Sequence, residues 1–159
     1  MDYRNYRAEI ETITKSLLEE YAADEMDFVI PLTEKYLALI DDNGNPKLSN
    51  KMKDIPLGFS GDVNLLVTVL IPVVASTLSK LVEFLTIERF RDAQLKASNH
   101  KRLEKLLSFS LEAKIDKLYN EITITISNSG ISRKKAKEIS TKIVQAALLE
   151  LKKNSSGKQ

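Results

Sequence analysis

The longest apolar stretch lies at the centre of the chain and predicts a long helix. Residues 63–87 read VNLLVTVLIPVVASTLSKLVEFLTI, with no charged residue between Asp62 and Lys80. On a helical wheel the small polar residues gather on one side, and the other side is apolar apart from Thr77. We take this apolar side as a candidate core or interaction face. Its named members are Leu66, Leu70, Val73, Val74, Leu78, Leu81 and Leu85.

The same stretch has a second interpretation as a membrane span. Its apolar character is typical of a transmembrane helix, although its uncharged run is short for one. The one-sided placement of polar residues is more typical of a central helix in a small soluble domain. We favour the soluble helix and keep a single span over residues 63–85 as the alternative. Pro72 lacks a backbone donor, so we expect a kink, or a break into two helices, near Ile71.

The N-terminal part of the chain predicts an amphipathic helix over residues 3–22. Its apolar seam follows helical spacings of three and four residues and consists of Tyr3, Tyr6, Ile10, Ile13, Leu17 and Tyr21. A seam of fewer than three heptads rarely forms a stable coiled coil alone. We therefore favour packing of this helix on the chain's own core over a dimerisation arm.

The region between the first helix and the central stretch leaves its structure open. Residues 27–32, DFVIPL, fit an edge strand ending at Pro31. Residues 33–40 fit either a short helix that Thr33 caps or a strand. Residues 41–62 are rich in Asn, Gly and Pro and predict a loop. Ser60 or Asp62 is the expected cap of the central helix.

The C-terminal half predicts further helices and one strand. Helical spacing continues beyond residue 87 with an interruption at Ser98 and Asn99, and a further helix runs to residue 119. Residues 121–127, EITITIS, alternate isoleucine and threonine with a period of two, so they predict a strand. A turn follows, Ser132 caps a helix over residues 132–152, and residues 153–159 form a polar, disordered tail.

The predicted fold class is therefore mainly α with a minor β element (α+β). We expect a single domain over residues 1–152, built around the central apolar helix, with one late strand followed by a C-terminal helix. The strand needs a pairing partner elsewhere in the chain or in a second copy, because its backbone groups must form hydrogen bonds.

Composition narrows the chemistry that this chain can perform. It has no cysteine and a single histidine, His100, which excludes disulfides, thiolate metal sites and sites with several histidines. The neighbouring acidic pairs Asp41–Asp42 and Glu19–Glu20 point in different directions on any regular element, so neither forms an acid/base couple. We identify no catalytic, cofactor-binding or metal-binding residue and do not expect an enzyme.

Charge is distributed unevenly along the chain. Residues 1–62 carry 13 Asp/Glu and 7 Lys/Arg, a net charge of −6, and the remaining residues carry 9 Asp/Glu and 17 Lys/Arg, a net charge of +8. This asymmetry favours attraction between the two halves, either within one chain or between copies. For a membrane protein it would place the basic C-terminal domain in the cytoplasm.

Four cations open the last predicted helix: Arg133, Lys134, Lys135 and Lys137. They oppose the helix dipole, so we treat them as a candidate anion-binding cluster. Residues 130–138, GISRKKAKE, resemble a helix start in the histone-like family of DNA-binding proteins, over nine residues. In that family the segment follows a helix, whereas here a strand is predicted before it, and the family's basic β-arms have no counterpart. No DNA-binding residue is carried over, and we do not expect nucleic acid as the partner.

The sequence favours a small non-enzymatic interaction or adaptor protein that self-associates or docks on another protein. The alternatives are a single-pass membrane protein, and a nucleic-acid or anion binder that uses residues 133–137. No apolar segment near residue 1 has the pattern of a secretory signal, so we expect the protein in the cytoplasm or at the inner face of a membrane.

Overall fold

Every regular element in the described part of the computed structural model is a helix. The structure describes residues 3–40, 65–98 and 101–156, with side chains for residues 5–40, 65–87 and 111–154. These residues form two 3-10 helices, η1 (Tyr3–Tyr6) and η2 (Ala23–Phe28), and the helices α1 (Arg7–Tyr21), α2 (Val29–Leu39), α3 (Leu66–Ser98), α4 (Lys101–Asn128) and α5 (Arg133–Ser156). The described part contains no strand, so the predicted α+β class is wrong.

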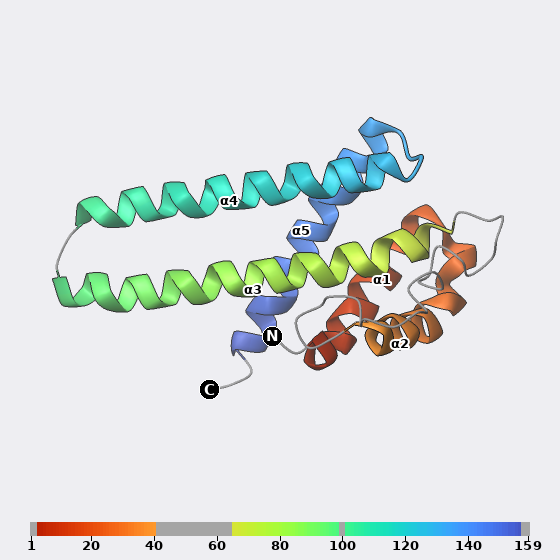
Figure 1. Ribbon diagram of the computed structural model, residues 1–159, viewed down its shortest axis with the longest axis horizontal. Helices are drawn as coiled ribbons and strands as arrows, with labels where there is room; N and C mark the ends of the chain where they lie inside the picture. Colours follow the sequence, from red (N-terminus) through yellow and green to blue (C-terminus); the bar gives the residue numbers. More distant parts are fainter. Residues whose placement is uncertain (1–2, 41–64, 99–100, 157–159) are drawn as a thin grey trace.

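Helix α3 is the element around which the others pack. It contacts α1, α2, α4 and α5. Figure 1 shows α3 and α4 as a long antiparallel pair, with α5 crossing both and α1 and α2 grouped beside the N-terminal part of α3. The region where α5 crosses the pair and α1 and α2 pack against α3 is called the body below.

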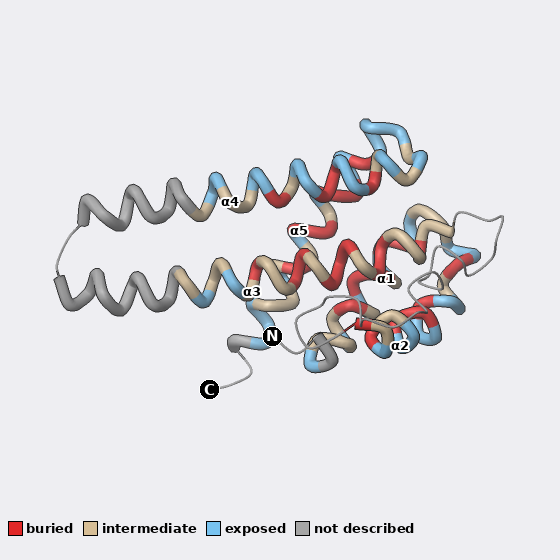
Figure 2. Tube along the Cα trace, viewed as in Figure 1, coloured by how far each residue is buried: buried red, intermediate tan, exposed pale blue. Residues whose placement is uncertain are grey.

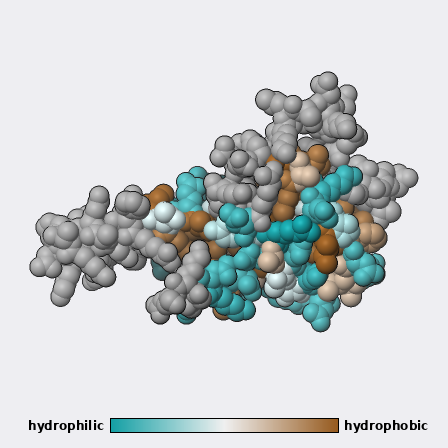
Figure 3. All heavy atoms as spheres, turned by 90° about the horizontal axis from the view of Figure 1, so that it is seen from below, coloured by the Kyte–Doolittle hydropathy of each residue, from teal (hydrophilic) through white to brown (hydrophobic). Residues whose placement is uncertain are grey.

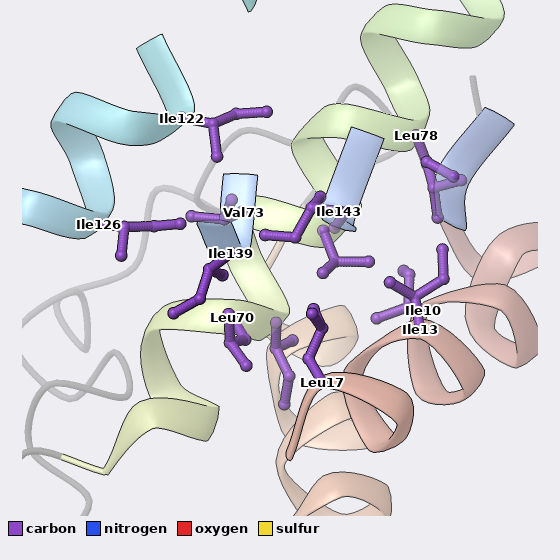
Figure 4. Packing of buried hydrophobic residues seen from close by; sticks show 14 of the residues in the cluster. Ile10, Ile13, Leu17, Leu70, Val73, Leu78, Ile122, Ile126, Ile139 and Ile143 are labelled. Atoms are coloured by element: carbon purple, nitrogen blue, oxygen red, sulfur yellow. The ribbon is translucent and has the colours of Figure 1, made fainter. Parts of the chain in front are cut away.

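The core of the body forms where the apolar stripes of α1, α3, α4 and α5 meet. Each stripe follows the spacing of three or four residues that places side chains on one face of a helix. Figure 4 shows the side chains that converge there: Ile10, Ile13 and Leu17 of α1, Leu70, Val73 and Leu78 of α3, Ile122 and Ile126 of α4, and Ile139 and Ile143 of α5. From Tyr6 to Tyr21 the seam predicted for the N-terminal helix thus packs on the chain's own core.

The strand predicted over residues 121–127 is the last part of α4. Ile122 and Ile126 are buried, whereas Ile124 is 59% exposed. A strand would place all three isoleucines on one face. In a helix, Ile122 and Ile126 are four residues apart and share a face, whereas Ile124, two residues from each, points away from it. Thr123 and Thr125 donate hydroxyl hydrogen bonds of 2.9 Å to the carbonyls of Tyr119 and Glu121, four residues back. Packing against α3 and α5 overrides the β preference of this segment.

The edge strand proposed for residues 27–32 is also wrong. Residues 23–28 form η2, and α2 begins at Val29 and ends at Leu39. Residues 33–39 are therefore helical, but Thr33 lies inside α2 and does not cap it. Pro31 is the third residue of α2, where a backbone donor has no partner within the helix, so proline is tolerated. Val29, Leu32 and Leu37 face the core.

The expected break of the central helix at Pro72 is not observed. Helix α3 runs from Leu66 through Pro72 to Ser98 as one element. Its end at Ser98 and the start of α4 at Lys101 agree with the predicted interruption. The candidate caps Ser60 and Asp62, the predicted loop 41–62 and His100 lie outside the described residues.

The turn between α4 and α5 has the predicted residues in the expected roles. The backbone N–H groups of Ser129 and Gly130 donate to the carbonyls of Ile126 and Ser127, both at 3.1 Å. Gly130 has a φ of 97°, a conformation that glycine adopts without strain. Ser132 accepts a hydrogen bond from the backbone N–H of Lys135 at 3.3 Å and so caps α5.

Helix α5 is longer than the sequence predicted. It continues to Ser156, so the proposal of a disordered tail is wrong for residues 153–156, and residues 157–159 lie outside the described part. Asn154 Nδ2 donates to Glu9 Oε1 at 2.7 Å, which ties the end of α5 to α1. Lys153 in the last turn also suits the negative end of the helix dipole.

Candidate interaction surface

The environment of α3 changes along its length. Of the predicted core or interaction face, Leu70, Val73, Val74, Leu78 and Leu81 are buried, and Leu66 and Leu85 are half-buried. Leu66 packs against the core cluster, whereas Leu85 is not among the described residues that do. No residue from Val82 to Ile87 is fully buried. The predicted stripe is therefore covered as far as Leu81 and only partly covered beyond it.

The change occurs where α3 and α4 leave the body. In Figures 1 and 2, α5 crosses the pair, and on the far side of this crossing only α3 and α4 continue. Leu118 is the first fully buried residue in the part of α4 whose side chains are described. We call residues 82–98 and 101–117, which continue from the body, the arm; Phe84 and Ile115 at its base still pack on the core cluster. Within the arm, Lys114 Nζ lies 5.5 Å from the centroid of the Phe84 ring, so the two helices stay in contact.

An apolar patch lies at the base of the arm. It consists of Val82 and Leu85, which are half-buried and belong neither to the core cluster nor to the described residues packed on it. Leu85 follows Leu81 by one helical turn, so it continues the stripe that faces the core within the body. Figure 3 shows hydrophobic surface beside the grey atoms at the left end, where the arm begins. We call these two residues the arm patch.

A shallow groove lies between α3 and α4 within the body. It has a volume of about 170 Å³ and is lined by Pro72, Val73, Ser76, Thr77, Lys80, Leu118, Glu121, Ile122 and Thr125. Ligand pockets are typically about 300–1,000 Å³, so this groove is small for a substrate site. The Thr77 hydroxyl donates to the Val73 carbonyl at 2.7 Å, which leaves its hydrogen engaged within α3.

An ion pair between α3 and α4 lies at the groove. Lys80 Nζ lies 2.9 Å from Glu121 Oε2. The hydrogen bond and the charge of Lys80 hold the pKa of Glu121 below its usual value. Both side chains are nearly half exposed, so the pair orients the two helices and contributes little to stability.

A buried carboxylate from η2 caps α3. Glu25, which is 8% exposed, accepts hydrogen bonds from the backbone N–H groups of Leu66 at 3.1 Å and Val67 at 2.7 Å. These groups have no partner within the helix, and the carboxylate also suits the positive end of the helix dipole. Sequence analysis missed this role because the partners are about forty residues apart, and no local spacing reveals such a contact.

The four cations of the predicted anion-binding cluster are all exposed, but their contacts with the rest of the protein differ. Lys135 Nζ lies 5.5 Å from the centroid of the Tyr21 ring, and Lys142 Nζ lies 4.9 Å from it. Lys142 also pairs with Glu20, and this hydrogen bond raises the pKa of Lys142. Arg133 and Lys134 form no ion pair with a described residue. The start of α5 therefore lies against the acidic end of α1.

The correction of the strand also affects the resemblance of residues 130–138 to the histone-like proteins. The segment follows a helix, as it does in that family, so one of the two differences disappears.

Comparisons of the chain with protein-family models, with curated proteins and with solved structures found no match.

Proposed function

We propose that this chain is a small non-enzymatic protein that acts by associating with protein, either with a second copy or with another chain. The arm carries the proposal, because it extends beyond α5 and has the half-buried arm patch at its base. Apolar side chains gathered on one face of a soluble protein commonly mark a site of association. Burying them removes apolar area from water, at about 25 cal/mol per Å².

The form of the surface suggests the kind of contact. The arm patch is made of aliphatic side chains on one face of α3, and such a face can bind the apolar face of a further helix. The groove beside Lys80 and Glu121 is a second shallow contact point on the same pair of helices. The groove is on the polar side of α3 and the arm patch on the opposite side, so a helical partner on the arm patch would leave the groove uncovered.

The proposal is tested by the native mass of the chain in a cell extract prepared without detergent. A tagged chain is expected to migrate well above its single-chain mass of 17.9 kDa. The matched control is the same extract after dilution into about 6 M urea, in which the tagged chain should migrate as a single chain. If all of the chain in the native extract is monomeric at tens of micromolar, the proposal is wrong.

A second candidate function, membrane association, rests on one observation. In the described residues, Leu66–Ile87 is long and apolar enough to cross a membrane, and half of its most apolar window is buried in the fold. The two states exclude each other, because a span would withdraw Leu70, Leu78 and Leu81 from the core and Leu66 from Glu25. We expect the chain in the detergent-free supernatant. Recovery only with detergent would favour the membrane alternative instead.

A further inference from the structure

We infer that α1, η2 and α2 form a lid that opens off α3 as a unit while α4 and α5 stay folded, and that Glu25 is the latch that holds the lid closed. The lid consists of residues 7–39. Both of its α-helices contact α3, and Figure 4 shows side chains of α1 converging with Leu70 and Leu78 of α3. Opening would uncover this buried apolar face. The inference goes beyond the proposed function and does not depend on it, because the opening takes place within one chain.

Buried polar atoms without partners are the first observation. Thr14 of α1 and Thr33 of α2 are both 0% exposed, and neither hydroxyl oxygen has a hydrogen-bond partner among the described residues. The buried Oε2 atom of Glu9 in α1 has none there either. Such an atom has given up its hydrogen bonds to water without replacing them, so it destabilises the closed lid and favours the open, hydrated one.

The buried hydroxyl groups of α3, α4 and α5 differ in this respect. Thr77 donates to the Val73 carbonyl at 2.7 Å, and Ser140 donates to the Ala136 carbonyl at 2.7 Å. Thr123 Oγ1 lies 3.0 Å from Ser140 Oγ, which joins α4 to α5. These hydroxyl groups carry no comparable cost. Proteins open in local units of different stability, and the lid is therefore expected to open before α4 and α5 separate.

The latch is the second observation. Glu25 of η2 is 8% exposed and accepts hydrogen bonds from the backbone N–H groups of Leu66 at 3.1 Å and Val67 at 2.7 Å. Hydrogen bonds to a carboxylate are stronger than those between neutral groups. By contrast, the ion pair of Lys142 with Glu20 joins the lid to α5 at exposed positions, where such pairs contribute little. Glu25 thus provides a strong, buried polar link between the lid and α3.

The length of the lid helices determines what opening exposes. Helices of 15 and 11 residues are marginal in water by themselves, so α1 and α2 would lose their helical hydrogen bonds on leaving α3. The N–H groups of Leu66 and Val67 would lose their acceptor at the same moment. These two amides are therefore expected to exchange with solvent together with the amides of the lid, although they belong to α3.

Native-state hydrogen exchange of the purified full chain, followed by NMR, tests the inference. In the wild type, the amides of α1 and α2 and those of Leu66 and Val67 should share one level of protection. That level should be at least about tenfold lower than the protection of Ile126, Ile139 and Ile143, which are buried in α4 and α5.

Two substitutions should move exchange in the lid in opposite directions. Glu25→Gln weakens the latch and should speed this exchange by about tenfold to a hundredfold. Thr33→Val removes an unpartnered hydroxyl at nearly constant shape and should slow it several-fold. The matched control is Thr77→Val, which removes a hydroxyl that is hydrogen-bonded and should not slow it.

Three results would overturn the inference. Equal protection of the lid and of α4 and α5 would show that the helices open together. Exchange in the lid that Thr33→Val does not slow would show that the unpartnered hydroxyl is not a cause of opening, and exchange that Glu25→Gln leaves unchanged would show that Glu25 is not the latch. If Glu25→Gln does not fold, the wild type and Thr33→Val still decide whether the lid opens as a unit.

Discussion

Two parts of one helix, α3, carry the same kind of apolar stripe but have different surroundings. From Leu66 to Leu81 the stripe packs among α1, α2 and α5, whereas between Val82 and Ile87 no described residue is fully buried and only Phe84 packs on the core. Leu85 follows Leu81 by one helical turn and lies on the same face of α3. The comparison teaches that an apolar face becomes core or contact surface according to the neighbours that reach it.

The largest expected effect separates these two parts directly. Leu78→Ala should reduce the free energy of unfolding by about 2–5 kcal/mol, because it leaves a cavity in a fully buried site. Leu85→Ala, one half-buried residue in the arm, should cost less than about 1 kcal/mol in the monomer. Urea denaturation at low protein concentration measures both. Equal losses would show that the arm is as tightly packed as the body.

The same comparison can be made between two faces of α4. Ile126→Ala should cost about 2–5 kcal/mol, because Ile126 is fully buried between α3 and α5. Ile124→Ala should be neutral or slightly stabilising, by up to about 0.5 kcal/mol, because alanine is the better helix former. Chemical denaturation of both variants distinguishes a helix from a strand. Similar costs at the two positions would favour the strand pattern.

The Glu25 cap at the start of α3 provides a test of what holds the buried part of this helix in place. Glu25→Gln should destabilise the protein by about 1–3 kcal/mol, since it removes a charged acceptor and turns an amide N–H toward the donors of Leu66 or Val67. Hydrogen exchange at those two amides should become faster. Glu19→Gln, at an exposed position of α1, is the matched control and should leave both measurements unchanged.

The smallest effect concerns the ion pair beside the groove. The pKa of Glu121 is lower in the folded protein than its ordinary value of 4.5. The stabilisation that the Lys80 pair gives is therefore present above the ordinary pKa of Glu121. It is lost as the pH falls through the lower pKa that Glu121 has in the folded protein. At about pH 7, Glu121→Gln should cost less than about 1 kcal/mol, because the pair is exposed. The difference from the wild type should vanish in acid, and a difference that grows in acid would contradict this assignment.

Helical periodicity in the sequence determined much of the fold. The N-terminal seam, the apolar face of the central helix and the C-terminal helix all lie within helices of the structure. Ser132 caps α5, and the helix that carries the central stretch ends at Ser98, as the local pattern predicted. These features depend on residues within a turn or two of one another, so the sequence alone contains the necessary information.

Only the tertiary structure decided the remaining features. Residues 121–127 satisfy both a period of two and, through Ile122 and Ile126, a spacing of four, and contacts with α3 and α5 select the helix. Glu25 caps a helix far along the chain, and the arm patch differs from the core only in what covers it. Contacts between distant segments determine these outcomes, and a local pattern of residues does not specify which segments will meet.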